Sequence, residues 1–324
     1  MARRLTVYLL RRLGFAALLV SLVSSAALVL AGLAPGDYSD QIALRGGSPE
    51  AVARERTRLG LDRPLLEQYV VWVGRAVRFD LGESFRFQRP VAALVRERIG
   101  KTALLGFAAL AFATLLGLPL GVLTGTRSGW VPGVIRAASL VLLSVPPLIS
   151  SLLLALLASR TGWFPVGGFS PAPVDAGWLE GMASVARQLA LPALALGLPF
   201  AATIERLQSQ AMVAAVAQPH IVAARARGLS WRRVVWRHAL RDALRPVAAI
   251  YGIVIGTLLG GSFVVEYVTS WPGLGKLMFD ALVSRDVYLV AGCAAAGSVV
   301  LAAGILVSDL LLATLDPRLR EEVR

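Results

Sequence analysis

The stretch Thr102–Thr126, TALLGFAALAFATLLGLPLGVLTGT, contains no charged residue. A helix needs about 20 apolar residues to cross the hydrocarbon core of a bilayer. The whole chain has the matching composition, because 56% of its 324 residues are hydrophobic and only 16% are charged. A soluble domain carries about 25% charged residues. The sequence therefore predicts an integral membrane protein whose apolar surface is solvated by lipid.

Further apolar segments predict an all-α membrane protein with about six transmembrane helices. The other expected spans are 13–34, 137–159, 188–216, 246–265 and 287–313. In the fourth of these, the uncharged part ends at Glu205. Pro146 and Pro147 in the third span should kink it, because proline removes a backbone donor. The first span is longer than the roughly 7–15 apolar residues of a signal-peptide core, so we expect it to be retained.

Arginines between the spans predict the orientation of the chain. Residues 205–245 hold eight arginines and two acidic residues. The N-terminal stub, the turn 127–136 and the C-terminal tail fall on the same side if the spans alternate, and they are also rich in arginine. Positive residues in short loops mark the cytoplasmic side. We therefore expect a multi-pass protein of the inner or plasma membrane with both termini cytoplasmic. The clustering also explains the net charge of +13 without nucleic-acid binding.

The expected organisation has three parts: an N-terminal stub with the first span (1–34), an external region (35–101) and a core (102–324). In the external region, Ser48 should cap a polar helix that begins at Pro49. An amphipathic helix is expected over Leu65–Phe79. Its aromatic residues suit either the membrane surface or the underside of an external cap of the protein.

Two spans carry glycines at every fourth position, which places them on one helix face. The residues are Gly117, Gly121 and Gly125 in the second span, and Gly252, Gly256 and Gly260 in the fifth. Glycine faces let helix backbones approach closely. Helix packing is the simpler interpretation. The alternative is that these smooth faces line a pathway whose walls slide past one another.

The cytoplasmic loop 217–245 has its own expected structure. Pro219 can open a helix, and Ala223 and Ala224 favour one while adding almost no bulk. Gly228 should break this helix. A second, basic helix is expected from Trp231 to about Leu244, with Ser230 as its cap. Such arginines could only anchor topology and bind anionic lipid, whereas the alanines favour a helix seated in a groove of another protein.

No chemical site is visible in the sequence. Gly100-Lys101-Thr102 resembles the end of a phosphate-binding loop, but the glycine required upstream is Val95 and no strand precedes it. The single cysteine, Cys293, and two histidines give no metal or disulfide pattern. We expect no cofactor, no metal and no enzymatic activity in this chain.

Several stretches in the order of the chain resemble the permease subunits of bacterial ABC importers of the dipeptide/oligopeptide/nickel group. They are "LAPGD" (Leu33–Asp37), "GLDRPLLEQYVVW" (Gly60–Trp72), "DLGESF" (Asp80–Phe85), "ARARGLSWRRVVWRHALRDALRP" (Ala224–Pro246), "SWPGLGKLMFDALVSRD" (Ser270–Asp286) and "DLLLATLDPRLR" (Asp309–Arg320). The loop resembles the EAA loop of these permeases, with Val222 in place of the glutamate.

The resemblance implies a type I importer architecture with a cytoplasmic coupling helix. Its implied partners are a second, similar permease, two ATPase subunits that bind ATP and Mg, an external substrate-binding lipoprotein and the lipid bilayer. The residues implied in ATPase coupling are Pro219, Ala223, Ala224, Arg225, Gly228, Leu229, Arg232, Arg233, His238 and Arg241. The last two positions depart from the general pattern.

The implied substrates are dipeptides or oligopeptides. Similar permeases serve nickel, glutathione or oligosaccharides, so these remain alternatives. A membrane scaffold or sensor that transports nothing is an alternative of another class.

Overall fold

The structure, a computed structural model, describes residues 2–40, 43, 46–165 and 177–315. In this part of the chain the ordered elements are helices, and β-pairing is limited to one isolated bridge between Glu83 and Pro90. The helices form two compact units, which we describe separately. One unit contains residues 104–271 with parts of both termini, and the other contains residues 10–103 and 272–302.

In the part of the chain that the structure describes, five helices are long and apolar enough to cross a membrane, and one bent pair raises the number of spans to as many as six. The five are α1 (Ala2–Leu33), α5 (Val91–Thr126), α8 (Trp178–Val216), α12 (Tyr251–Val268) and α14 (Val287–Leu315). The bent pair is α6 (Trp130–Ser144) and α7 (Pro147–Thr161), which meet at 108°. The predicted number of about six spans agrees with this.

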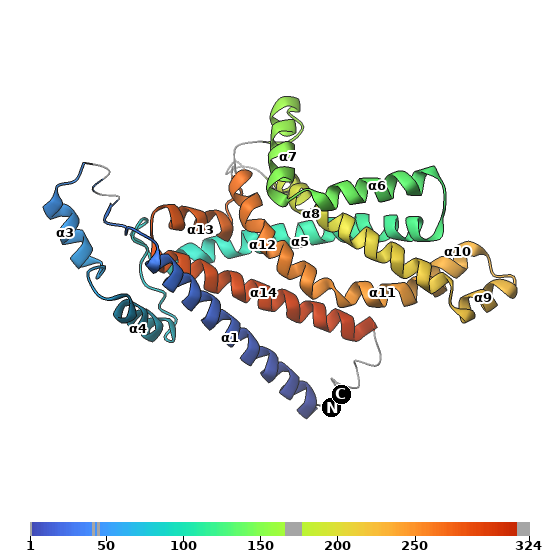
Figure 1. Ribbon diagram of the computed structural model, residues 1–324, viewed down its shortest axis with the longest axis horizontal. Coiled ribbons are helices and arrows are strands. Elements are labelled where there is room, and N and C mark those ends of the chain that lie inside the picture. Colours follow the sequence, from blue (N-terminus) through green and yellow to red (C-terminus); the bar gives the residue numbers. More distant parts are fainter. Residues whose placement is uncertain (1, 41–42, 44–45, 166–176, 316–324) are drawn as a thin grey trace. The chain divides into compact units, whose positions relative to one another are not determined.

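The expectation of one helix over 137–159 is wrong, because the chain breaks between α6 and α7 (Figure 1). Pro146 and Pro147 both lack a backbone donor, and a proline pushes the preceding residue away from helical geometry. Val145 accordingly adopts extended backbone with ψ 113°. Pro147 then opens α7 at the position where a missing N–H costs nothing. Two adjacent prolines therefore produce a sharp turn where we expected a kink.

Other helix ends also differ from expectation. Helix α5 begins at Val91 and α8 begins at Trp178, both earlier than expected. Pro246 does not start the fifth span; it lies inside α11 (Leu240–Ala249), and α12 follows after Ile250. Charged residues near a span do not end a helix whose other faces are buried in protein, so charge alone misplaced these boundaries.

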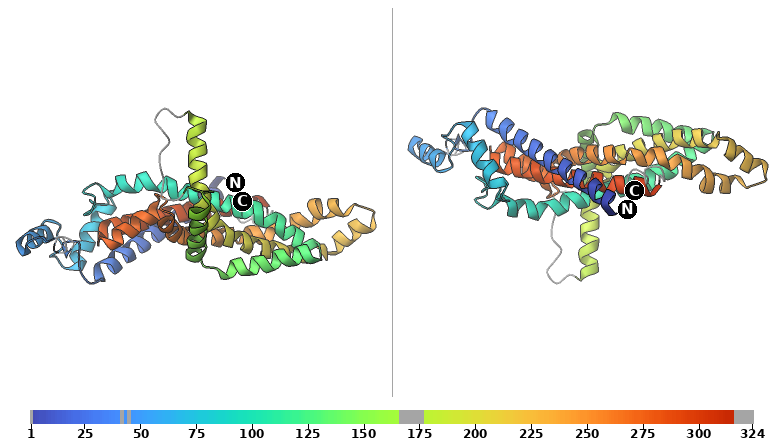
Figure 2. Two further views of the ribbon diagram at one scale, coloured as in Figure 1. Left: turned by 90° about the horizontal axis from the view of Figure 1, so that it is seen from above. Right: turned by 90° about the horizontal axis from the view of Figure 1, so that it is seen from below.

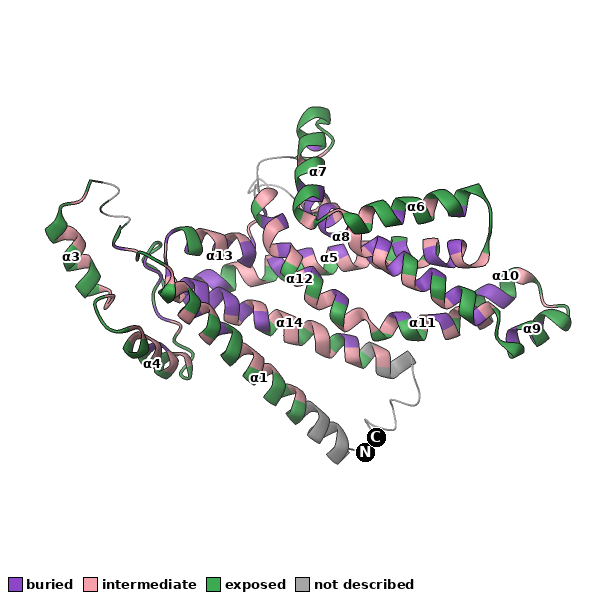
Figure 3. Ribbon diagram, viewed as in Figure 1, coloured by how far each residue is buried: buried purple, intermediate pink, exposed green. Residues whose placement is uncertain are grey.

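In the unit containing 104–271, α8 is the central helix. Helices α6, α7, α11 and α12 all pack on it (Figures 1 and 2). Its core side includes Leu196, Ile204 and Met212, which are fully buried. Buried residues gather along α8, whereas α7 is largely exposed (Figure 3). Most leucines of α7 are exposed, whereas Leu154 packs against a buried core cluster.

The second unit is built on the first part of α5, α13 (Leu274–Val283) and the start of α14, which share a core around Val91, Leu277 and Leu289. Helices α3 (Pro49–Arg58) and α4 (Leu65–Ala76) occupy the expected positions. The Ser48 side chain accepts a hydrogen bond from the Ala51 N–H, as predicted for a cap.

A buried carboxylate ties the external segment to this core. Asp286 is fully buried and accepts hydrogen bonds from the Ser84 hydroxyl (2.6 Å), the Arg86 N–H (3.1 Å) and the Leu289 N–H (3.1 Å). The last of these bonds caps the start of α14. Burial raises the pKa of Asp286, and these hydrogen bonds oppose the rise.

Candidate functional site on the arginine-rich loop

The arginine-rich loop is an ordered helical projection at one end of α8 (Figures 1 and 2). It contains α9 (Pro219–Ala226), α10 (Trp231–Arg233) and the π-helix η1 (Val234–Ala239), and it continues directly into α11. Helix α9 also contacts α8 and η1. The loop is therefore braced on two sides.

One face of α9 belongs to a core of its own. Ile221 and Ala224 are 1% and 2% exposed. Ile221 packs with buried side chains from α5, α8, η1 and α11: Val122, Met212, Ala215, Val234, Val235, Ala239 and Ala243. Displacement of α9 would expose this apolar surface to water. The cost of that exposure holds α9 against α8 and η1. Ala224, a predicted coupling residue, is also buried and does not lie on the surface.

The other face of α9 is open to solvent. Val222 is 57% exposed, and Ala223 and Ala226 are exposed beside it. These side chains are short and apolar, so a partner could approach the helix backbone closely. We call this face, formed by Val222, Ala223 and Ala226, the outer face of α9.

Gly228 ends the helix in the way the sequence predicts. Its φ is +82°, a left-handed conformation that glycine adopts without a steric penalty. Its N–H donates to the Arg225 carbonyl (3.0 Å). The Arg225 guanidinium lies 4.9 Å from the ring centre of Trp231, so a cation–π contact joins α9 to α10 across the turn.

The second helix of the loop differs from its prediction. We expected one α-helix from Trp231 to about Leu244, whereas the middle of this segment is the π-helix η1. Ser230 occupies the N-cap position as expected, although its side chain makes no capping hydrogen bond. A π-helix inserts an extra residue per turn and is often found at functional sites.

The exposed residues of the loop are strongly basic. Arg232, Arg233 and Arg241 are exposed, whereas His238 and Leu229 are half-buried and Pro219 is exposed at the start of α9. Residues 218–245 contain seven arginines and one acidic residue, Asp242. The surface beside the outer face of α9 therefore carries positive charge.

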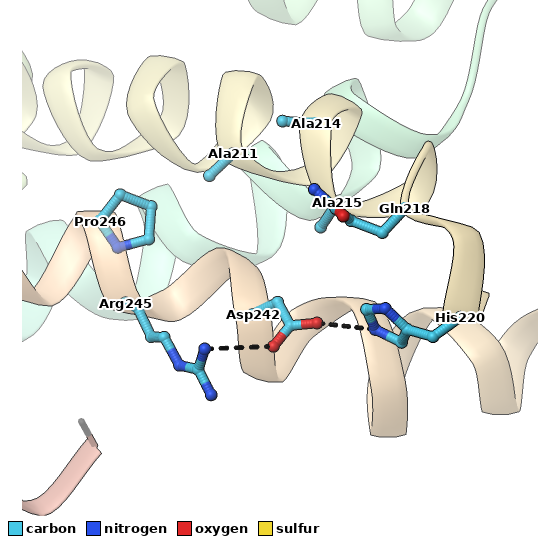
Figure 4. A pocket seen from close by; sticks show the side chains of 8 residues that line it. All are labelled: Ala211, Ala214, Ala215, Gln218, His220, Asp242, Arg245 and Pro246. Carbon is cyan, nitrogen blue, oxygen red and sulfur yellow. Dashed lines mark hydrogen bonds and ion pairs between the residues drawn. The ribbon is translucent and has the colours of Figure 1, made fainter. Parts of the chain in front are cut away.

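Asp242 and His220 form a contact that sequence reasoning missed. His220 Nε2 lies 2.9 Å from Asp242 Oδ2, and Arg245 Nη1 lies 3.7 Å from Asp242 Oδ1 (Figure 4). These groups border a cavity of about 360 Å³, which is also lined by Ala211, Ala214, Ala215, Gln218 and Pro246. The sequence does mark Asp242 as the single acidic residue of an arginine-rich segment. An acid in such surroundings is expected to pair with a basic side chain.

The two glycine series have different surroundings. A methyl group built on Gly117 or Gly121 would lie 2.6 Å from a backbone carbonyl oxygen of α8, and one on Gly125 would lie 2.5 Å from another. In contrast, Gly252 only approaches the Ser308 hydroxyl, and a methyl group on Gly260 would meet nothing within 4 Å. Gly256 is half-buried. The first series lies in a close α5–α8 contact.

The α5–α8 contact also buries polar groups that the sequence analysis placed at the end of a span. Glu205 is 2% exposed and accepts a hydrogen bond from the Thr124 hydroxyl (2.5 Å). Gln208, one turn further along α8, is fully buried, and its side-chain amide has no hydrogen-bond partner among the described residues. The glycines of α5 allow this close approach.

In the residues that the structure describes, no three His, Cys, Asp or Glu side chains gather to hold a metal ion. Long apolar helices, one broken pair and an ordered basic loop define a polytopic helical membrane protein.

Comparisons with known proteins identify the family. The model of the binding-protein-dependent transport system inner membrane component matches residues 117–321, and the model of its N-terminal region matches residues 5–106. The chain therefore belongs to the family of inner membrane components of binding-protein-dependent transport systems.

Curated relatives match over most of their length. A putative peptide permease protein of Brucella ovis is 36% identical, with 90% of this chain and 92% of that protein covered. The oligopeptide transport system permease protein OppB of Mycobacterium bovis is 34% identical, with 98% and 99% covered. AppB of Bacillus subtilis, also named an oligopeptide permease, is 34% identical, with 81% and 83% covered.

The fold also resembles a solved structure. A chain of the MetNI methionine ABC transporter in an inward-facing conformation matches with a TM-score of 0.53 and 19% identity. The match covers 69% of this chain and 97% of that chain. At this identity it supports the fold alone.

Proposed function

We propose that this chain is a permease subunit of an ATP-driven importer for dipeptides or oligopeptides. The relatives that match over nearly the whole chain are named peptide or oligopeptide permeases, and this supports the substrate class. The chain would form the pathway together with a second, similar permease. An external binding protein would deliver the peptide.

The energy would come from partner subunits that bind ATP and Mg, and the outer face of α9 would be their contact. One observation carries this proposal: α9 is fixed on one side by Ile221 and Ala224 and presents short apolar side chains on the other. A helix that transmits force must be held rigidly where it is supported. The surrounding arginines would orient the ATPase through long-range charge attraction.

A bulky substitution on the outer face tests this contact. Ala223→Trp leaves the core of the loop untouched, whereas Ser128→Trp adds the same bulk to the exposed turn between α5 and α6. At a central interface position we expect a loss of about 2 kcal/mol, or roughly thirtyfold in ATPase affinity. The measurement is co-purification of the ATPases and peptide uptake in proteoliposomes. Wild-type assembly and uptake in the Ala223→Trp complex would overturn the assignment.

The proposed orientation places both termini and the loop 217–245 in the cytoplasm of a cell whose inner membrane holds the importer. Cys293 is buried, so a Cys293→Ala chain provides a background without thiols. A cysteine introduced at the exposed residue Ser230 should react with an impermeant maleimide only in inside-out vesicles. Labelling in intact, right-side-out cells would show that the loop faces outward and that the proposed orientation is wrong.

The substrate class has a separate test. Cells that lack this permease should fail to grow when a required amino acid is supplied only as a dipeptide or oligopeptide, and the cloned chain should restore growth. Restoration of nickel uptake without peptide uptake would favour the alternative substrate.

A further inference from the structure

The unit containing residues 10–103 has an apolar cavity of about 670 Å³, outside the loop described above. Helices α1, α4, the first part of α5 and α14 all contribute to its walls. Representative lining residues are Val20, Ser24, Tyr69, Trp72, Phe79 and Ala295. Pockets for small molecules usually have volumes of about 300–1,000 Å³. The cavity is therefore large enough for an extended ligand.

Two polar groups at this cavity are available to a ligand. Trp72 is 3% exposed, and its indole Nε1 has no hydrogen-bond acceptor among the described residues. A buried tryptophan N–H usually finds one. Arg96 also lines the cavity, is exposed, and forms no ion pair in the described part of the chain. The cavity thus offers a buried donor and a cation at the edge of apolar walls.

The cavity extends along two of the candidate membrane spans. Its residues on α14, Gly292–Val299, lie about 8–18 Å along the helix from Val287, because an α-helix rises about 1.5 Å per residue. The residues on α1 lie at a similar distance from Leu33. Half of the hydrocarbon core measures about 15 Å. Tyr69 and Trp72 are the residue types found where acyl chains meet headgroups.

We propose that this cavity holds one acyl chain of an anionic phospholipid, with the phosphate beside Arg96. The apolar walls would bury the chain, and an ester carbonyl would supply the acceptor that Trp72 lacks. A transmembrane segment of another protein fits less well, because its backbone carbonyls are already bonded within the helix and it brings no anion. A peptide would leave its backbone groups unsatisfied against these walls.

Fluorescence quenching tests this site directly. The full-length chain is placed in phosphatidylcholine vesicles that contain a minor fraction of phosphatidylglycerol. Bromine is carried on the acyl chains of one lipid or the other, and it quenches indole fluorescence on contact. The chain has seven tryptophans, so each variant is compared with its Trp72→Phe counterpart to isolate Trp72.

Brominated phosphatidylglycerol should quench Trp72 with about fivefold preference over brominated phosphatidylcholine, as expected for one basic residue near an anionic lipid. Arg96→Gln should abolish the preference, and Ala295→Leu should reduce quenching by both lipids. The matched controls are Arg98→Gln, which leaves the cavity lining intact, and Gly297→Leu, where added atoms meet open space.

Two results would overturn the proposal. Trp72 emission that neither brominated lipid quenches would mean that the cavity is closed or filled by protein. Equal quenching by both lipids in the wild-type chain, unchanged by Arg96→Gln, would exclude the phosphate contact. Arg96 is exposed, so its substitution keeps the test valid even if Ala295→Leu impairs folding. Peptide uptake is not needed for any of these readouts.

Discussion

The close α5–α8 contact makes Gly121→Ala an informative change. A methyl group at Gly121 would lie 2.6 Å from both the Glu205 carbonyl oxygen and the Gln208 Cβ. Neither atom can move without its helix, because one is backbone and the other is bonded directly to it. The two helices must therefore separate, or α5 must bend.

The magnitude follows from a comparison with Gly106 on the same helix. There an added methyl group would meet Leu258 and Leu259 at 3.6 Å, an ordinary van der Waals distance. Both substitutions gain the same helix propensity, about 1 kcal/mol for alanine over glycine. Overpacking typically costs about 1–3 kcal/mol, and it applies only at Gly121. The difference in unfolding free energy between the two variants should therefore be about 1–3 kcal/mol, with Gly121→Ala the less stable.

The assay is unfolding of the purified chain by SDS in mixed micelles, followed by far-UV circular dichroism. Gly106→Ala serves as the control for propensity and for purification effects. If the two variants unfold with the same free energy, the close contact between α5 and α8 does not exist in the folded protein, and the polar groups around Glu205 are not enclosed as described.

Three further predictions address the loop and the external segment. Gly228→Val should destabilise the loop by about 1–2 kcal/mol because φ is +82°, with Gly228→Asn less affected; local hydrogen exchange measures this, and equal protection in both variants would contradict it. Arg225→Ala should cost about 0.5–1 kcal/mol by removing the cation–π contact with Trp231, whereas Arg225→Lys should retain part of it, as thermal unfolding would report. Asp286→Ala should destabilise the chain by roughly 2–4 kcal/mol, because the donors that Asp286 satisfies, among them the Ser84 hydroxyl, lose their acceptor. Because burial raises the pKa of Asp286, stability also depends on pH. The stabilisation linked to proton binding is present below the unfolded pKa of about 3.9 and is lost as pH rises through the folded pKa, while the hydrogen bonds to the carboxyl group remain. Asp286→Asn should remove this pH dependence.

Local sequence patterns predicted the helical elements well. An uncharged run as long as Thr102–Thr126 predicts a membrane span, because about 20 apolar residues cross the hydrocarbon core. The helix cap at Ser48 and the helix break at Gly228 could also be predicted, since a cap and a left-handed turn depend on one residue and its immediate neighbours. The break at Pro146 and Pro147 was underestimated, because the sequence marks a missing hydrogen bond but not the angle that follows.

In the candidate loop, too, some features follow from the sequence and others only from the tertiary structure. Its position, charge and glycine break come from the sequence, which therefore determined that a basic, helical projection follows α8. Only the tertiary structure decided that Ala224 faces inward and Ala223 outward, because side-chain burial depends on which helices pack against α9. The same reason separates the two glycine series: identical spacing in α5 and α12 places glycines on one face, but only packing brings α8 against the first of them.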